Sequence, residues 1–184
     1  MIMKELTNKW VKALMVLLTI TAVLSTSCKK DDDKDDDKKA DYVGKWTSEE
    51  TITSEESTES YKDIMTLTRT TFEDIIQTPD SDDEWVDSFV LKGTISANGQ
   101  VMDVHVAEIG VSDIDPVSGE FNGNMTTYKE GSLLFEAIIA ESGHEKDFQS
   151  EYSIEGNKMT LKTDTNDDGD YNDENETTVY TRMQ

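Results

Sequence analysis

Alternating hydrophobic and polar residues characterise most of the chain after residue 39. In the clearest run, Phe89, Leu91 and Ile95 alternate with polar residues, and a period of two residues is typical of a half-buried β-strand. Asn98-Gly99 follows this run and favours the positive φ angles of a tight hairpin turn. A second alternating run comes after the turn, so the pattern predicts an antiparallel hairpin over 88–109.

The same pattern predicts further strands. A second hairpin is expected over 148–161, with its turn at Gly156-Asn157. The apolar run SLLFEAIIA at 132–140 predicts a strand that is buried on both faces near its middle. Weaker alternation predicts strands over 45–53, 64–70, 71–77, 119–127 and 177–183. About nine closely spaced strands without long helical periodicity suit an antiparallel up-and-down barrel or a sandwich.

Residues near the two ends of this region favour the barrel. Gly44-Lys45-Trp46 opens the first predicted strand and resembles the G-x-W signature of lipocalins and their shorter relatives. In those families the tryptophan closes the bottom of the barrel and an arginine from the last strand packs over it, as Arg182 would here. The resemblance covers 40–184 and extends to lipocalin-like lipoprotein domains of Bacteroidota-type bacteria. It implies an all-β, up-and-down barrel of about 8–9 strands, with Trp46 and Arg182 in a structural role.

The first 27 residues have the features of an export signal. Lys4 and Lys9 precede the stretch ALMVLLTITAVL at 13–24, which is uncharged and almost wholly apolar. As a helix this stretch would rise about 18 Å, whereas the hydrocarbon core of a bilayer is roughly 30 Å thick. A basic start, a short apolar stretch and small residues after it are typical of a secretory signal peptide, predicted here at 1–27.

The cysteine that follows the signal predicts a lipid anchor. Leu24-Ser25-Thr26-Ser27-Cys28 resembles a bacterial lipoprotein box, with the leucine one position earlier than usual. In such proteins cleavage leaves the cysteine as the first mature residue, carrying acyl chains such as palmitate. Each buried methylene of an acyl chain contributes roughly 0.8 kcal/mol, so two or three chains anchor a protein without a spanning helix. Cys28 is therefore the predicted lipidation site.

A charged segment without apolar residues separates Cys28 from the barrel. Residues 29–39 are almost entirely Lys and Asp, so they cannot bury a core and are expected to form a solvated, disordered tether. A lipidated cysteine followed by such a stretch also resembles the surface-export signal of Bacteroidota-type lipoproteins. That resemblance implies the outer membrane and the cell surface; the alternative is a spacer without a routing role.

Charge and cysteine content exclude several classes of protein. The chain has 40 Asp and Glu against 17 Lys and Arg, a net charge of −23, so the phosphates of a nucleic acid would repel it. A single cysteine excludes an internal disulfide, and with two histidines it leaves no zinc cluster of Cys and His. Nucleic acid is therefore not a predicted partner. The membrane is one, because the acyl chains at Cys28 would insert into it.

The acidic segment 164–176 is a candidate calcium site. It contains seven acidic residues and no basic one, and its order matches the first half of the calcium-loop pattern D-x-[DN]-x-[DN]-G. Position twelve of the pattern is Asn175 instead of the usual bidentate Glu. A solvated acidic loop without a cation is the alternative, and magnesium is less suited because it resists dehydration. The candidate ligands are Asp164, Asn166, Asp168, Asp170, Asn172, Glu174 and Glu176.

If the segment binds calcium, millimolar calcium should raise the midpoint of thermal unfolding, because a ligand that binds only the native state stabilises it. The affinity expected for such a site is that of weak extracellular modules, about 10⁻⁴–10⁻³ M. Melts recorded with calcium and with a chelator measure the shift, and Asp168→Ala should abolish it. An unchanged midpoint at millimolar calcium contradicts the site.

The remaining chemistry favours a binding module over an enzyme. His105 and His144 have no evident partners, and no Ser-His-Asp arrangement, phosphate loop or nucleophile elbow is present. We therefore expect a non-enzymatic barrel that binds a small apolar or amphipathic ligand. The alternative is a structural or adhesive interaction domain with a solidly packed barrel. An open interior lined by Phe89, Met102, Val104, Phe135 and Tyr152 would favour the first.

Overall fold

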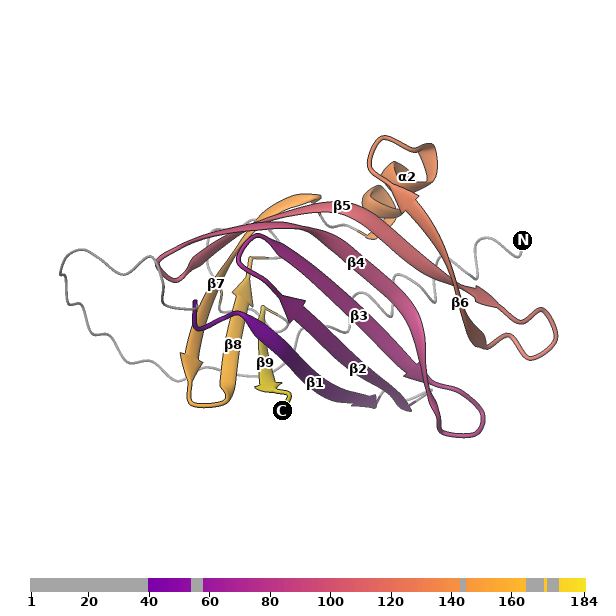
Figure 1. Ribbon diagram of the computed structural model, residues 1–184. Coiled ribbons are helices and arrows are strands. Elements are labelled where there is room, and N and C mark those ends of the chain that lie inside the picture. Colours follow the sequence, from indigo (N-terminus) through magenta and orange to yellow (C-terminus); the bar gives the residue numbers. More distant parts are fainter. Residues whose placement is uncertain (1–39, 54–57, 143–144, 165–170, 172–175) are drawn as a thin grey trace.

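The computed structural model describes residues 40–53, 58–142, 145–164, 171 and 176–184. These residues form an antiparallel up-and-down β-barrel with one short helix (Figure 1). The elements are β1 (Gly44–Thr53), β2 (Thr58–Leu67), β3 (Thr71–Pro79), β4 (Trp85–Asn98), β5 (Val101–Ile114), β6 (Phe121–Lys129), α2 (Leu133–Ser142), β7 (Asp147–Glu155), β8 (Lys158–Thr163) and β9 (Thr177–Arg182). The predicted fold class is thus confirmed.

Eight strands close the barrel and the ninth is an addition. Each neighbouring pair is antiparallel, and the circle closes where β1 pairs with β9, with Trp46 opposite Arg182. The long strand β5 pairs with β4 along one edge. Along its other edge, the first part of β5 pairs with β7 and the last part with β6. The segment β6–α2 is therefore an insertion between two strands of the barrel.

The predicted strand over 132–140 is wrong, because this segment is the helix α2 (Leu133–Ser142). A short apolar run does not distinguish a buried strand from a helix by its period. Local hydrogen bonds favour the helix: the Ser132 hydroxyl accepts the backbone N–H of Phe135 as an N-cap, and Glu136 accepts the N–H of Gly131. Phe135 is fully buried, and α2 contacts β6 (Figure 1).

The two predicted hairpins are present, with one difference in a turn. The second turns at Gly156-Asn157 as predicted, and Gly156 has a φ of 63°. In the first, Asn98 still pairs with Val101, so the turn consists of Gly99-Gln100 and not of Asn98-Gly99. Gly99 has a φ of 66°, which fits a type II′ turn with glycine at its first central position.

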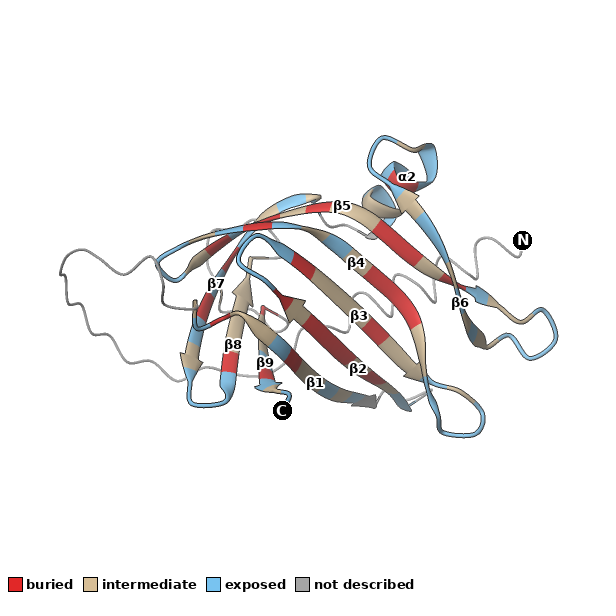
Figure 2. Ribbon diagram, viewed as in Figure 1, coloured by how far each residue is buried: buried red, intermediate tan, exposed pale blue. Residues whose placement is uncertain are grey.

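Buried positions are interrupted by intermediate and exposed ones along most strands (Figure 2). At the bulge between Lys92 and Gly93, the two longest strands approach closely. A Cβ on Gly93 would lie 1.8 Å from the backbone oxygen of His105, so only glycine fits there.

On β2 the buried positions are Tyr61, Asp63, Met65 and Leu67, together with Ile64. One of the inward positions of this strand is thus a carboxyl group.

Candidate ligand-binding site

The interior of the barrel contains a cavity of about 480 Å³. This volume is within the range of about 300–1,000 Å³ that is usual for small-molecule sites. Strands β2 to β5, β7 and β8 and the helix α2 supply an apolar wall that includes Met65, Phe72, Phe89, Leu91, Met102 and Ile139. The barrel is therefore not packed solid by its own side chains.

Three of the five residues expected to line an open interior do so. Phe89, Met102 and Val104 line the cavity. Phe135 is instead buried in the core from α2, and Tyr152 donates its hydroxyl to the Gly99 carbonyl at 3.0 Å, beneath the first hairpin. The difference for Phe135 follows from the helical conformation of its segment.

Two carboxyl groups lie together at one side of this cavity. Asp63 on β2 and Asp74 on β3 are inward positions of adjacent strands, and their side chains are hydrogen-bonded to each other. Asp63 is 5% exposed, and Tyr180 donates its hydroxyl to Asp63 Oδ2 at 2.7 Å. Asp74 lines the cavity. Its side chain is half-buried, and its Oδ1 is buried.

Burial raises the pKa of both carboxyl groups. For Asp63, burial and then the neighbouring charge of Asp74 raise the pKa well above its usual range, and the hydrogen bond from Tyr180 lowers it by less. For Asp74, burial raises the pKa and the bond from Asp63 lowers it. A hydrogen bond between two carboxyl groups needs a proton on one of them, so the two groups share a proton. Each carboxyl group therefore keeps its proton to a higher pH than an exposed carboxyl group does.

The carboxyl pair of Asp63, which is buried, and Asp74, which is half-buried, has few hydrogen bonds. Among the described residues, no N–H or O–H group donates to Asp63 Oδ1 or Asp74 Oδ1, apart from the proton that the two carboxyl groups share. Burial raises the pKa of Tyr180 well above its usual range as well, so its hydroxyl remains a donor. An ionised carboxyl group alone has about four acceptor sites, and buried polar groups are normally satisfied. The pair therefore retains capacity for further donors.

The other ionisable groups in the cavity are also acidic. Within the described part of the chain, no Lys, Arg or His side chain lines the cavity. Ser150 and Thr163 add a neutral polar contact of 2.7 Å between their hydroxyls. The ionisable lining residues are Asp74, Glu145, Asp147, Asp164, Glu176, Tyr171 and Tyr180. The cavity thus combines an apolar wall with negative charge.

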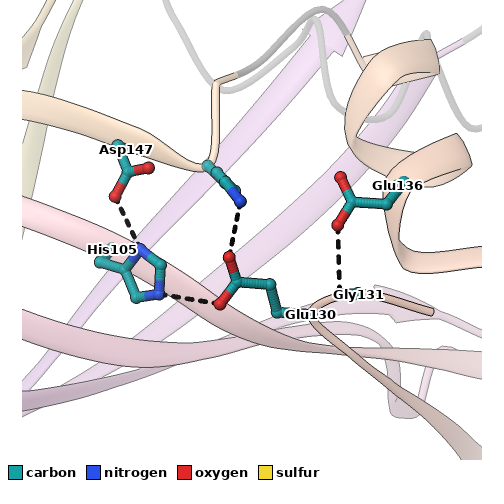
Figure 3. A network of polar contacts seen from close by, with 6 residues as sticks. His105, Glu130, Gly131, Glu136 and Asp147 are labelled. Atoms are coloured by element: carbon teal, nitrogen blue, oxygen red, sulfur yellow. Dashed lines mark hydrogen bonds and ion pairs between the residues drawn. The ribbon is translucent and has the colours of Figure 1, made fainter.

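His105 has partners that the sequence did not indicate. Figure 3 shows its ring between two carboxylates: Nδ1 lies 2.6 Å from Asp147 Oδ1 and Nε2 lies 3.2 Å from Glu130 Oε2. Lys146 donates to the other oxygen of Glu130 at 2.6 Å. The bond to Asp147, and then the charges of Asp147 and Glu130, raise the pKa of His105. The cluster joins β5 and β7 to the turn between β6 and α2.

The structure brings Trp46 and Arg182 together at the closure of the barrel. The Arg182 guanidinium lies 4.0 Å from the centroid of the Trp46 ring, and the indole N–H donates to the Tyr42 carbonyl at 2.8 Å. Arg182 also donates to the carbonyl oxygens of Val43, at 3.0 Å, and of Asp41. One arginine thus binds the start of the barrel to its last strand.

Most of the candidate calcium loop lies outside the described residues. Asp164 and Glu176 are described and line the cavity, with Glu176 only 1% exposed. Within the part of the chain that is described, no group of three or more His, Cys, Asp or Glu residues has the arrangement of a metal site. The other proposed ligands, Asn166, Asp168, Asp170, Asn172 and Glu174, are not among the described residues.

The carboxyl pair is the part of the site that the sequence analysis missed. Its signal was present in the alternation: Asp63 lies between Tyr61 and Met65 on the inward face of β2. Asp74 has the same place between Phe72 and Ile76 on β3. On each strand the carboxylate occupies a position where the alternation predicts a hydrophobic residue. Such a position on two adjacent strands indicates a polar group inside a barrel.

The signal peptide, the lipidation site Cys28 and the tether also lie outside the described residues, which begin at residue 40. Among the described residues, α2 is too short to span a bilayer as a helix, and no other helix could do so.

The chain was compared with protein-family models, curated proteins and solved structures. It matches none of them.

Proposed function

We propose that this protein is a lipid-anchored outer-membrane lipoprotein whose lipocalin-like, non-enzymatic barrel binds a small amphipathic ligand at the cell surface. The observation that carries the binding function is the 480 Å³ cavity, which has an apolar wall and a carboxyl pair at one side. The membrane anchor and the surface location rest on the sequence around Cys28.

The composition of the cavity supports an amphipathic ligand in particular. Each methylene group that leaves water for an apolar site contributes about 0.8 kcal/mol, and the apolar wall from β2 to β5 offers such a site. The carboxyl pair fixes the position of a polar end, as a small number of polar groups does in most small-molecule sites.

The alternative functions fit the interior less well. A packed interaction domain would not need an open interior with a buried carboxyl pair. A glycosidase places its two carboxyl groups about 5–9.5 Å apart, whereas Asp63 and Asp74 are in direct hydrogen-bond contact. This pair therefore does not have the separation needed to flank a glycosidic bond.

Filling the cavity should abolish binding of an apolar probe. Leu91 lines the cavity, and Leu91→Trp replaces free space with an indole ring. We expect the full chain to bind the fluorescent dye N-phenyl-1-naphthylamine and the variant to bind it at least about tenfold more weakly, a change of about 1.4 kcal/mol. Fluorescence titration measures both affinities.

Val179→Trp is the matched control, since Val179 is 47% exposed on β9 and does not line the cavity. Both variants carry the same N-terminal segment, so dye binding to that segment cancels in the comparison. Equal dye affinity in the two variants would contradict binding in the barrel interior.

A further inference from the structure

The sign of charge in the cavity points to the chemistry of the ligand. Asp74 and Tyr180 both line the cavity, and Asp63, which does not line it, is hydrogen-bonded to each of them. On the same inward face of β3, Phe72 and Ile76 flank Asp74. Across the strands, Met65 is its register partner. An acidic group thus lies among apolar side chains at the wall of an open space.

We propose that the ligand is a cationic amphiphile, an organic primary ammonium with an apolar body, whose ammonium group lies against Asp74. This inference rests on the proposed binding function and adds the charge and chemical class of the ligand.

Hydrogen bonding supports an ammonium group at this position. A primary ammonium carries three N–H donors and no acceptor. Tyr180 donates only to Asp63, and Asp63 is the partner that the described residues provide for Asp74. An ammonium group would supply the missing donors and, as a neighbouring positive charge, would favour the ionised form of Asp74. A charge-assisted hydrogen bond of this kind is roughly twice as strong as a neutral one.

The other ionisable groups that line the cavity disfavour an anionic ligand. Beyond the pair and Tyr180, the ionisable groups that face the cavity come from the segment before β7 and from the ends of β7, β8 and β9. They are Glu145, Asp147, Asp164, Tyr171 and Glu176. Asp147 is bound to His105, and none of the described lining residues is a cation. A carboxylate ligand, such as a fatty acid, would find acidic groups and no cation among these described lining residues.

Three ligands with the same apolar chain test this inference: n-decylammonium, n-decanol and n-decanoate. Each is titrated below its micelle concentration into the full chain at pH 7, and displacement of N-phenyl-1-naphthylamine reports binding. We expect decylammonium to bind at least about tenfold more tightly than decanol, and decanoate to bind most weakly.

The variant Asp74→Asn removes the charge with almost no change in volume. It should lower the affinity for decylammonium to that of decanol and leave decanol binding unchanged, which also shows that the cavity remains folded. Asp63→Asn/Asp74→Asn is the second variant, because it removes both carboxyl groups if Asp63 takes up the charge in the single variant. Asp103→Asn is the matched control: Asp103 is exposed on the outer face of β5 and accepts a hydrogen bond from Gln149. It should bind all three ligands as the parent does.

The outcomes separate this inference from the proposed function. Equal affinity of the parent for decylammonium and decanol would overturn the inference and leave the binding function intact. An equal loss of decylammonium binding in Asp103→Asn and Asp74→Asn would also overturn it, since general surface charge would then explain the preference. If none of the three ligands displaces the dye, both the inference and the binding function fail.

Discussion

Trp46→Ala should lower the free energy of unfolding by about 3–5 kcal/mol, the usual cost of removing a large aromatic side chain from a core. Trp46 has no exposed surface, its indole N–H donates to the Tyr42 carbonyl, and the Arg182 guanidinium lies over its ring. The substitution therefore leaves a cavity, an unpaired carbonyl and an arginine without its aromatic partner. Urea unfolding followed by circular dichroism measures the loss.

Trp85→Ala provides the comparison, because the same side chain is removed from a position that is 36% exposed. Trp85 has Lys62 5.7 Å from the centroid of its ring, and an exposed cation–π contact of this kind contributes about 0.5–1 kcal/mol. If Trp46→Ala costs no more than Trp85→Ala, the closure of the barrel does not depend on the contact between Trp46 and Arg182.

Asp63→Asn should stabilise the protein near neutral pH, by about 1–3 kcal/mol, because the folded chain no longer has to bury a group whose pKa burial has raised, while the hydrogen bonds are kept. The amide oxygen can still accept the hydroxyl of Tyr180, and the amide N–H can donate to Asp74. Stabilisation by a substitution inside a core is unusual, so the sign of the effect is diagnostic. Thermal and urea unfolding at pH 7 measure it.

The same pair predicts how stability depends on pH. The pKa of Asp63 and of Asp74 is raised in the folded chain, so between about pH 4, the ordinary carboxyl range, and the raised pKa the folded state binds more protons than the unfolded state. The free energy of unfolding should therefore decrease as the pH rises through this window. Asp63→Asn should reduce the slope.

Two other contributions, from His105 and from surface charge, can also change how stability depends on pH, so each needs its own control. The raised pKa of His105 adds stability that is complete below the unfolded pKa of about 6.5 and is lost as the pH rises through the folded value. His105→Gln removes this contribution, and Asp103→Asn shows how much one unit of surface charge changes the slope. A slope that is unchanged in Asp63→Asn, or a variant less stable than the parent at pH 7, would contradict the buried charged pair.

The strands could be predicted from the sequence because half-buried strands alternate in polarity. The hairpin of β4 and β5 follows from Phe89, Leu91 and Ile95 and from a glycine turn. The helix α2 could not be predicted in this way, since its apolar run has no strand-like or helix-like period that decides between them. Its N-cap, the Ser132 hydroxyl bound to the N–H of Phe135, is a local signal that distinguishes the two.

The candidate site was predictable only in part. An open interior with Phe89, Met102 and Val104 in its wall follows from the inward phase of the strands. The contact between Asp63 and Asp74 depends on the register of β2 with β3, in which Asp63 pairs with Ile76 and Met65 with Asp74. Register between strands is a tertiary property that is set by the buried face and the turn. It therefore could not be obtained from the composition of either strand.

The closure of the barrel has a consequence for how the chain folds. Most strand pairs join neighbours in sequence, but Arg182 donates to the Val43 carbonyl across 139 positions of the chain. Contacts of such long range form late, since the entropy of loop closure has to be overcome before they contribute. We infer that the hairpins form first and that the junction between β1 and β9 is made last. Until then the barrel is an open sheet with two unpaired edges, which is the form most exposed to aggregation.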